Sequence, residues 1–452
     1  MSTATKNMPQ VEPNPAVKRM RELMNMDELN NCIRCGFCLP ACPTFRETGL
    51  EQASPRGRIA LMKAAVDGHM QAGDELRKQL ELCLGCRACE PACPSGVHYG
   101  ELLEEAKEAL EEHTKRSWGV RWLRGVTLRW LFVSPKRMRF LGRLIRFYQR
   151  SGLQSFVRRM GWLNILPEHL RDMEAVLPEA SPSGVVLEMG TFVPAKGKKI
   201  GTVGMFSGCI MDILFLETNK NTVKLLSEAG YDVVIPPGQN CCGALHAHNG
   251  ERNTARKLAI NNVRAFKDAG VDYIVSNAGG CGALLKEYDH LLGDHVREVT
   301  PEEVRWFASR VKDVSELLDE AALPDAGRLD ERITYQGSCH LQNVMGVKLP
   351  PRRLLQRIEG AEYVELFESD RCCGSAGIYN MVQPDMAGRI LDEKMGHVAQ
   401  TRADTLVTSN PGCLLQMQHG IRKVGLEDRM RAVHLVDLLV EARENRTKAG
   451  AD

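Results

Sequence analysis

The sequence predicts a multidomain α+β protein with a mainly helical N-terminal domain, a basic helical segment, and a C-terminal α/β domain built as a duplication. Three observations lead to this fold class. At 452 residues, the chain exceeds what a single hydrophobic core usually supports. Two four-cysteine motifs of identical spacing lie near the N-terminus, and another cysteine pattern occurs twice in the second half of the chain.

Composition changes along the chain mark the expected domain boundaries. A cysteine-dense region ends near Glu112, an acid-free basic stretch follows, and a linker rich in Pro, Gly and Ser precedes the duplicated part. We therefore expect a helical cysteine domain over residues 1–112, a basic segment and linker over 113–199, repeat 1 over 200–295, a connection over 296–329, and repeat 2 over 330–452.

The overall composition narrows the class of protein. The 59 basic and 57 acidic residues nearly cancel, which gives no support to nucleic-acid binding. No run of eighteen apolar residues occurs and the opening residues lack an apolar signal core, so we expect a cytoplasmic protein. Sixteen cysteines in a reducing compartment indicate metal ligation rather than disulfides.

The N-terminal cysteines carry the strongest chemical signal. The spacing C-x2-C-x2-C-x3-C-P occurs once from Cys32 to Pro43 and again from Cys83 to Pro94. In two-cluster ferredoxins, the first three cysteines of such a motif ligate one cube and the fourth ligates the other. We therefore predict two [4Fe-4S] clusters, one held by Cys32, Cys35, Cys38 and Cys93, and the other by Cys83, Cys86, Cys89 and Cys42.

Two zinc sites are the structural alternative, because zinc also takes four thiolates. The tight pattern ending in Cys-Pro favours the ferredoxin interpretation. The motifs begin 51 residues apart, which leaves room for helices, and helical periodicity occurs over 57–66, 74–82 and 99–113. This arrangement resembles the α-helical ferredoxin type rather than the compact bacterial one.

The second half of the chain repeats itself at intervals of 130, 131 and 132 residues. Short β-branched runs at 231–235, 273–275 and 405–408 alternate with helical periodicity at 254–269 and 386–401, which predicts α/β layering. The repeated cysteines could form a further iron-sulfur site or could be buried thiols packing each core. They are Cys209, Cys241, Cys242 and Cys281 in repeat 1, and Cys339, Cys372, Cys373 and Cys413 in repeat 2. We assign no ligand role to His246, His248 or His340.

The segment between the cysteine regions is strongly basic. From His113 to Pro167 it contains no acidic residue, and Lys136, Arg139, Arg143, Arg146 and Arg150 recur at helical spacing. Met138, Leu141, Leu144, Ile145 and Tyr148 are expected on the opposite face. This pattern favours a helix lying on anionic lipid or on a membrane partner, with Trp118, Trp122 and Trp130 at headgroup level, over a helical scaffold.

Motifs for organic cofactors are missing. The one G-x-G, from Gly280 to Gly282, has Leu285 where a dinucleotide fingerprint requires glycine, and no P-loop occurs. We therefore expect no flavin or NAD and no catalytic residue on this chain, with electrons entering and leaving through partners.

Together these motifs resemble the iron-sulfur subunit of glycolate oxidase, also called glycolate dehydrogenase. The resemblance covers most of the chain. It is carried by NCIRCGFCLPACPTF at 31–45, SPRGRIALMKA at 54–64, CLGCRACEPACPSGVHYGELLEEA at 83–106, and the two CCG repeats.

The resemblance implies an oxidoreductase complex in which a flavin subunit oxidises glycolate to glyoxylate and this chain carries electrons towards a quinone. It also implies a peripheral location on the inner face of the inner membrane. Related subunits serve anaerobic glycerol-3-phosphate and D-lactate dehydrogenases, and the cysteine spacing does not separate them. A heterodisulfide reductase, an alternative of another class, would end each repeat in C-x-x-C, whereas Leu284 and Gln416 occupy those places here.

Overall fold

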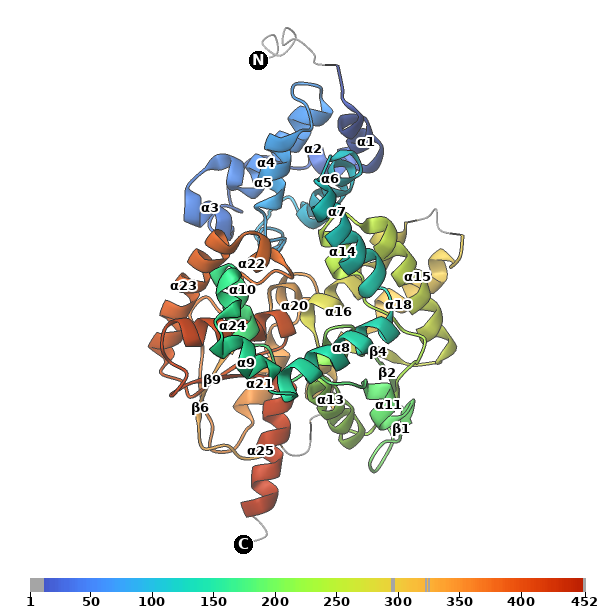
Figure 1. Cartoon of the computed structure of the whole chain (residues 1–452). Helices are drawn as coiled ribbons and strands as arrows, with labels where there is room; N and C mark the ends of the chain where they lie inside the picture. Colours follow the sequence, from blue (N-terminus) through green and yellow to red (C-terminus); the bar gives the residue numbers. More distant parts are fainter. Residues whose placement is uncertain (1–11, 294–296, 322, 324–325, 450–452) are drawn as a thin grey trace. The chain divides into compact units, whose positions relative to one another are not determined.

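The computed structural model describes residues 12–293, 297–321, 323 and 326–449. The chain divides into two compact units (Figure 1). Among the described residues, those up to 123 together with 245–254 form unit 1, and those of 124–244 and from 255 onward form unit 2. Residues 245–254, which lie inside the range expected for repeat 1, therefore fold with the N-terminal cysteine region.

Every regular element described in unit 1 is helical, as the sequence predicts. Proline at the first helical position begins α3 and α4, because its fixed φ suits a helix start and its missing N–H is not needed there. The apolar faces of α1, α4, α5 and α6 form one core that includes Met20, Met62 and Leu102. The elements are α1 (Pro15–Leu23), α2 (Met26–Asn30), α3 (Pro43–Thr48), η1 (Glu51–Ala53), α4 (Pro55–Val66), α5 (Asp74–Glu81), α6 (Tyr99–His113) and α7 (Trp118–Arg124).

Charged side chains bind residues 245–254 to α6. Arg252 Nη1 lies 3.1 Å from Glu108 Oε2, with both side chains almost fully buried. His248 Nδ1 lies 2.9 Å from Glu104, and Lys107 donates to the His248 carbonyl. Burial alone would raise the pKa of Glu104, but His248 and the nearby arginines lower it to about 2.

Unit 2 contains two sheets built on one plan. The first has the strand order β1-β3-β2-β4-β5 and the second β7-β6-β8-β9, with all pairs parallel except β1 with β3. The equivalent strands occupy equivalent places, which confirms the duplicated α/β prediction. The strands are β1 (Phe192–Val193), β2 (Gly201–Met205), β3 (Tyr231–Val234), β4 (Tyr273–Ser276), β5 (Val311–Asp313), β6 (Arg332–Gln336), β7 (Glu362–Val364), β8 (Thr405–Thr408) and β9 (Arg431–His434).

The two repeats share a hydrophobic core. Leu226 on α13, Leu318 on α19 and Leu355 on α21 belong to one buried cluster that also contains Leu439 on α25. The repeat helices are α12 (Met211–Leu214), α13 (Leu216–Glu228), α14 (Ala244–His248), α15 (Arg252–Asp268), α16 (Gly279–Lys286), α17 (Tyr288–Leu292), α18 (Pro301–Arg310), α19 (Val314–Glu320), α20 (Cys339–Asn343), α21 (Leu349–Gln356), α22 (Tyr379–Val382), α23 (Pro384–Thr401), α24 (Pro411–Lys423) and α25 (Leu435–Ala449).

The basic segment of unit 2 is helical, but its faces differ from the expectation. Met138 and Gly142 are buried against the chain, whereas Leu144, expected on the same side as Met138, is half exposed. The elements are η2 (Gly125–Leu131), α8 (Pro135–Arg150), α9 (Leu153–Arg159), η3 (Trp162–Ile165), α10 (Glu168–Ala175) and α11 (Val185–Met189). Within the described ranges, no helix combines the length and apolarity needed to cross a bilayer.

We expect the Arg252→Met variant to destabilise unit 1 by about 3–5 kcal/mol, because it removes the guanidinium that lies 3.1 Å from the buried Glu108 carboxylate. The denaturant midpoint of helix loss under anaerobic conditions would measure this. Lys78→Ala is the control, since it breaks an exposed pair with Glu75 that contributes about 1 kcal/mol or less. Equal midpoints for the two variants would contradict the assignment.

Candidate iron-sulfur sites

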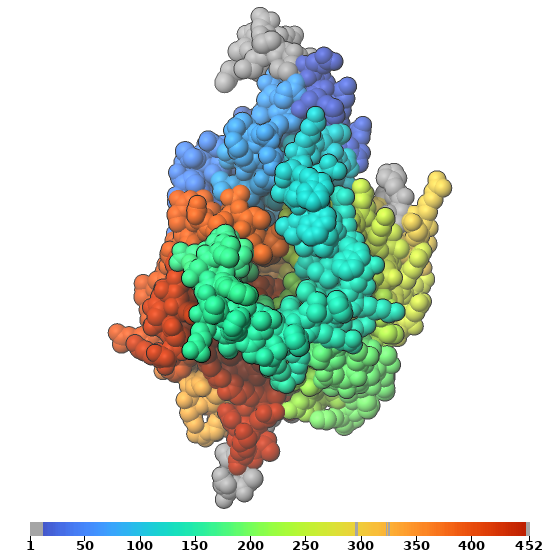
Figure 2. Space-filling view, in the orientation of Figure 1, coloured from blue at the N-terminus to red at the C-terminus, as the bar shows by residue number. Residues whose placement is uncertain are grey.

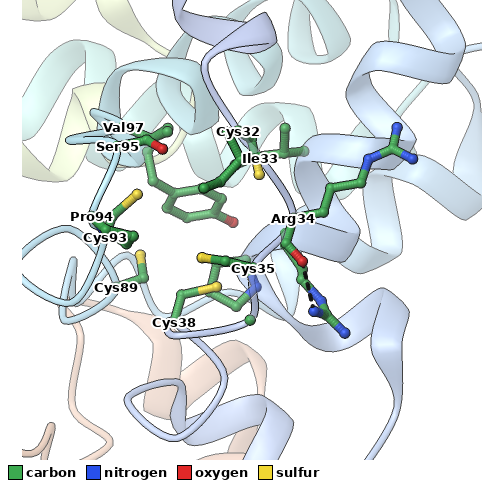
Figure 3. Close-up of a pocket in the computed structure, with 15 residues that line it drawn as sticks. Cys32, Ile33, Arg34, Cys35, Cys38, Cys89, Cys93, Pro94, Ser95 and Val97 are labelled. Carbon is green, nitrogen blue, oxygen red and sulfur yellow. Dashed lines mark hydrogen bonds between the residues drawn. The ribbon is translucent and has the colours of Figure 1, made fainter.

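A cavity in unit 1 gathers cysteines from both N-terminal motifs. Cys32, Cys35 and Cys38 of the first motif line it together with Cys93 of the second, and Cys89 borders the same space. Figure 3 shows the sulfurs of these residues directed towards a common interior. The cavity encloses about 410 Å³ of atom-free space, part of it open to solvent. This grouping supports the proposed ligand set with Cys93 contributed by the other motif.

Left-handed backbone bends each motif around its second cysteine. Arg34 and Gly36 flank Cys35 with φ of 58° and 90°, and Gly85 and Arg87 flank Cys86 with φ of 65° and 58°. Arginine in this conformation is strained, so contacts must stabilise it. The Arg34 carbonyl accepts a hydrogen bond from Arg56, and the Arg87 guanidinium pairs with Glu90.

The second thiol set lies beside basic side chains. Arg58 is completely buried, donates from Nε to the Gln79 carbonyl and from Nη2 to Thr44, and lies beside Cys42 and Cys83. Burial raises the pKa of the Cys83 thiol, but Arg58 and Lys107 lower it by more, so the net shift is downward. The backbone N–H of Gly85 and the Tyr99 hydroxyl also donate to the Cys83 sulfur.

Cys86 and Cys89 are buried near Cys83 and Cys42. The pKa of Cys89 is raised by burial and by the negative charges of its neighbours, which include Cys86, Cys83 and Cys42. Four thiols beside the buried Arg58 and the partly buried Lys107 suit a thiolate-bound cluster, because the cations offset the charge concentrated there. The fit supports Cys83, Cys86, Cys89 and Cys42 as the second proposed ligand set.

Repeat 1 brings its four cysteines together. Cys209 Sγ lies 3.3 Å from Cys241 Sγ, and Cys242 hydrogen bonds to both Cys241 and Cys281. Hydrogen bonds with neighbouring thiols, together with burial, raise the pKa of Cys241 and of Cys281.

Repeat 2 forms an equivalent set from Cys339, Cys372, Cys373 and Cys413. Hydrogen bonds from Cys372 and Cys413 lower the pKa of Cys373, and the buried Lys394 lowers it further. Cys372 also donates to Cys339, and His340 Nδ1 lies 3.5 Å from the Cys339 sulfur. Burial lowers the pKa of Lys394 to about 8, although Cys373 and Cys372 oppose this shift.

Zinc would use the same four-thiolate ligand sets, because zinc binds four cysteines tetrahedrally. The two C-x2-C-x2-C-x3-C-P motifs of unit 1, with their soft thiolate donors, favour multi-iron clusters over zinc there.

Sequence reasoning missed the groups that surround the thiols. Arg58 lies within the SPRGRIALMKA stretch, one helical turn after Ser54. Its position on a helix that follows the first cysteine motif is the one sequence feature that indicated a basic group near the thiols. Lys394 and Asn410 gave no signal, because their proximity to cysteines depends on how α23 and α24 pack.

The fold and the four thiol sets define an iron-sulfur electron-transfer protein with a ferredoxin-type unit and a duplicated cysteine-rich unit. Three family descriptions match it: a 4Fe-4S dicluster domain at 28–97, the linker region of the glycolate oxidase iron-sulfur subunit at 119–177, and a cysteine-rich domain at 203–286 and 333–418. The chain belongs to the family of glycolate oxidase iron-sulfur subunits.

Similar proteins agree with this membership. A probable glycolate oxidase iron-sulfur subunit of Bacillus subtilis is 50% identical over 98% of this chain and 100% of its own length. The glycolate oxidase iron-sulfur subunit of Escherichia coli is 31% identical over 85% of this chain and 88% of its own length. Lactate utilization protein A of Oceanobacillus iheyensis is 33% identical over 54% of this chain and 98% of its own length.

We expect the Cys93→Ser variant to lose the same paramagnetic signal as Cys35→Ser, and Cys42→Ser the same signal as Cys86→Ser. The reason is that each fourth cysteine serves the cluster of the other motif. Electron paramagnetic resonance of anaerobically purified, reduced protein would measure this, and the N-terminal unit should contribute about eight irons. If Cys93→Ser and Cys86→Ser lost the same signal, each fourth cysteine would belong to its own motif's cluster and the proposed ligand sets would be wrong. Stoichiometric zinc in the purified protein would contradict the assignment of iron-sulfur clusters.

Proposed function

We propose that this chain carries electrons from a flavin-bearing subunit, which oxidises glycolate to glyoxylate, towards a quinone acceptor. The observation that carries the proposal is the convergence of Cys32, Cys35 and Cys38 with Cys93 on one cavity. Clusters bound there would supply one-electron transfer.

The chain's own residues prepare the sites for this role. Arg58 and Lys107 offset the charge of the buried thiolates, and the Gly85 N–H and Tyr99 hydroxyl orient one sulfur. At the first site, Cys35 is exposed, and the neighbouring Ile33 and Phe37 side chains are each 68% exposed. This uncovered edge supports electron exchange with a partner, since apolar side chains favour contact with another protein surface.

Other substrates of the complex are compatible with the same electron-relay role. Relatives named lactate utilization protein A match about half of this chain, so lactate is an alternative donor for the complex, beside the glycerol-3-phosphate that the family resemblance allows. Disulfide catalysis is disfavoured because each repeat has an apolar or amide residue, Leu284 or Gln416, at the place of a fifth cysteine.

We expect the cluster-loaded chain alone to show no oxidation of glycolate, D-lactate or glycerol-3-phosphate with a quinone or artificial acceptor. Removing two electrons from an alcohol requires a hydride acceptor beside the carbon, which a flavin supplies. Activity should appear when the flavin-bearing subunit is added, and the substrate that reduces the complex fastest identifies the donor. Turnover by the flavin-free chain would contradict the relay role.

We also propose that unit 2 contacts an anionic membrane surface through α8, α9 and η3. Figure 2 shows α8 and α9, coloured teal to green, at the surface facing the viewer. Phe140, Leu144 and Phe147 share one exposed face of α8 because they are spaced by four and three residues. Phe156, Met160, Trp162 and Ile165 are also exposed.

Three of the five basic residues that the sequence places in this row of α8 contact the chain itself. Arg143 and Arg146 donate to the carbonyls of Pro182 and Ala180, and Arg150 pairs with Glu179. These contacts hold the 178–182 segment against α8, so the exposed aromatic face, rather than the arginine row, would enter the lipid headgroups.

We expect the triple variant Phe140→Ser, Leu144→Ser, Phe147→Ser to bind phosphatidylserine-containing vesicles at least tenfold more weakly. Each apolar side chain removed from the interface costs about 1.5–3 kcal/mol when fully buried, and tenfold is 1.4 kcal/mol. Vesicle sedimentation would measure this, with the exposed Leu349→Ser as the matched control. Unchanged binding, or binding lost equally in the control, would identify the face as a protein contact or scaffold.

A further inference from the structure

The two cysteine-rich repeats can be compared position by position. Asp272 and Asp404 each accept the backbone N–H of a neighbouring strand's residue, Thr202 in repeat 1 and Arg332 in repeat 2. Two residues earlier, Gly270 and Arg402 are both left-handed, with φ of 61° and 51°. These shared features set an offset of 132 residues for the helices that precede them, α15 and α23. On this register, Lys394 of α23 corresponds to Asn262 of α15.

Lys394 places a buried cation beside the thiols of repeat 2. Its residue is 2% exposed, and its Nζ donates to the Glu368 carbonyl, 2.6 Å away. The same carbonyl accepts the N–H of Arg371, the residue before Cys372. The loop that carries the paired cysteines therefore holds the ammonium group next to Cys372 and Cys373, whose charges act on it.

Asn262 occupies the same place in repeat 1 with a neutral amide. It is completely buried, accepts the Asn240 N–H, and donates to the Cys241 carbonyl and the Tyr288 hydroxyl. Tyr288 in turn donates to the Cys242 carbonyl. Asn262 and Tyr288 thus place neutral hydrogen-bonding groups beside the paired cysteines of repeat 1.

A second difference between the repeats also places a polar group beside a thiol of repeat 2. His340 follows Cys339 in repeat 2, and its ring nitrogen lies 3.5 Å from the sulfur. Ile210 follows the equivalent Cys209 in repeat 1 and offers no hydrogen bond. Repeat 2 therefore has both an additional cation and an additional polar group near sulfur.

The Asn410 side chain joins the two thiol sets. Its Oδ1 accepts the backbone N–H of Gly280, the residue before Cys281, at 3.0 Å. Its Nδ2 lies 3.5 Å from the Cys413 sulfur. A single amide therefore connects a cysteine-bearing helix of repeat 1 to a sulfur of repeat 2, which supports exchange between the sites.

We propose that Lys394, with His340, makes the thiolate site of repeat 2 a better electron acceptor than the site of repeat 1, so that an electron shared between them resides in repeat 2. This rests on the proposed relay function and on cluster occupancy of both repeats. Reduction adds one negative charge without a bond or proton change, and a buried cation stabilises that charge.

Other charges near Lys394 do not cancel its effect. Arg371 lies between the carboxylates of Glu368 and Glu393, and His397 lies near Glu368. These carboxylates are partly exposed and paired with Arg371, so solvent and the guanidinium reduce their influence on the thiols. Asp370 is exposed, whereas Lys394 is buried.

Reciprocal substitutions test the proposal in the full-length, anaerobically reconstituted chain. Lys394→Asn should lower the reduced-to-oxidised ratio of the repeat 2 signal at least tenfold at fixed ambient potential, which is 59 mV for one electron. Asn262→Lys should raise that ratio for repeat 1, and Lys394→Arg should retain the wild-type value. Redox titration followed by paramagnetic resonance measures each ratio, with signals assigned by Cys373→Ser and Cys242→Ser.

The outcomes separate this inference from the relay function. An unchanged repeat 2 ratio in a folded Lys394→Asn variant overturns it, and so does an equal shift of all signals. If Lys394→Asn fails to fold, two other variants still test the inference. Asn262→Lys should raise the reduced-to-oxidised ratio of repeat 1, and Lys394→Arg should keep the wild-type ratio of repeat 2. Iron confined to the N-terminal unit also overturns it, while electron transfer from the flavin-bearing subunit to that unit would leave the relay function intact.

Discussion

The concentration of thiolate charge in buried places is the constraint on which much of the structure depends. A buried thiolate is costly unless metal, hydrogen bonds or cations stabilise it. Unit 1 meets this need with Arg58, which is completely buried and bonded to Thr44 and the Gln79 carbonyl. Proline-started helices and left-handed turns then bend each motif around its second cysteine, Cys35 or Cys86.

The duplicated unit buries two sets of cysteines and surrounds them with different side chains. Its two sheets have equivalent strand orders and share one apolar core, so both repeats present their cysteines in equivalent loops. Gene duplication supplies equal scaffolds, but Asn262 and Lys394 give them unequal electrostatics. A relay benefits from such inequality, because sites of equal potential do not favour either direction of transfer.

Polar contacts between chain segments distant in sequence fix the remaining geometry. The buried Arg252 and Glu108 pair joins residues 245–254 to α6 within unit 1, although 144 residues separate the two partners. The arginines of α8 likewise bind the 178–182 segment. Amphipathic periodicity identified α8 as a helix. Its arginines bind another segment of the same chain, and aromatic side chains on the same helix are exposed.

The sequence alone determined the helical cysteine domain, the α/β duplication and the iron-sulfur class, because these depend on local spacing, periodicity and repeat length. β8 begins and ends where the β-branched run does, and α6 spans its predicted residues. Tertiary structure alone decided which face of α8 is exposed, that residues 245–254 join unit 1, and that Arg58 and Lys394 lie beside thiols. Those features arise from packing between elements far apart in the chain, which no local pattern of residues encodes.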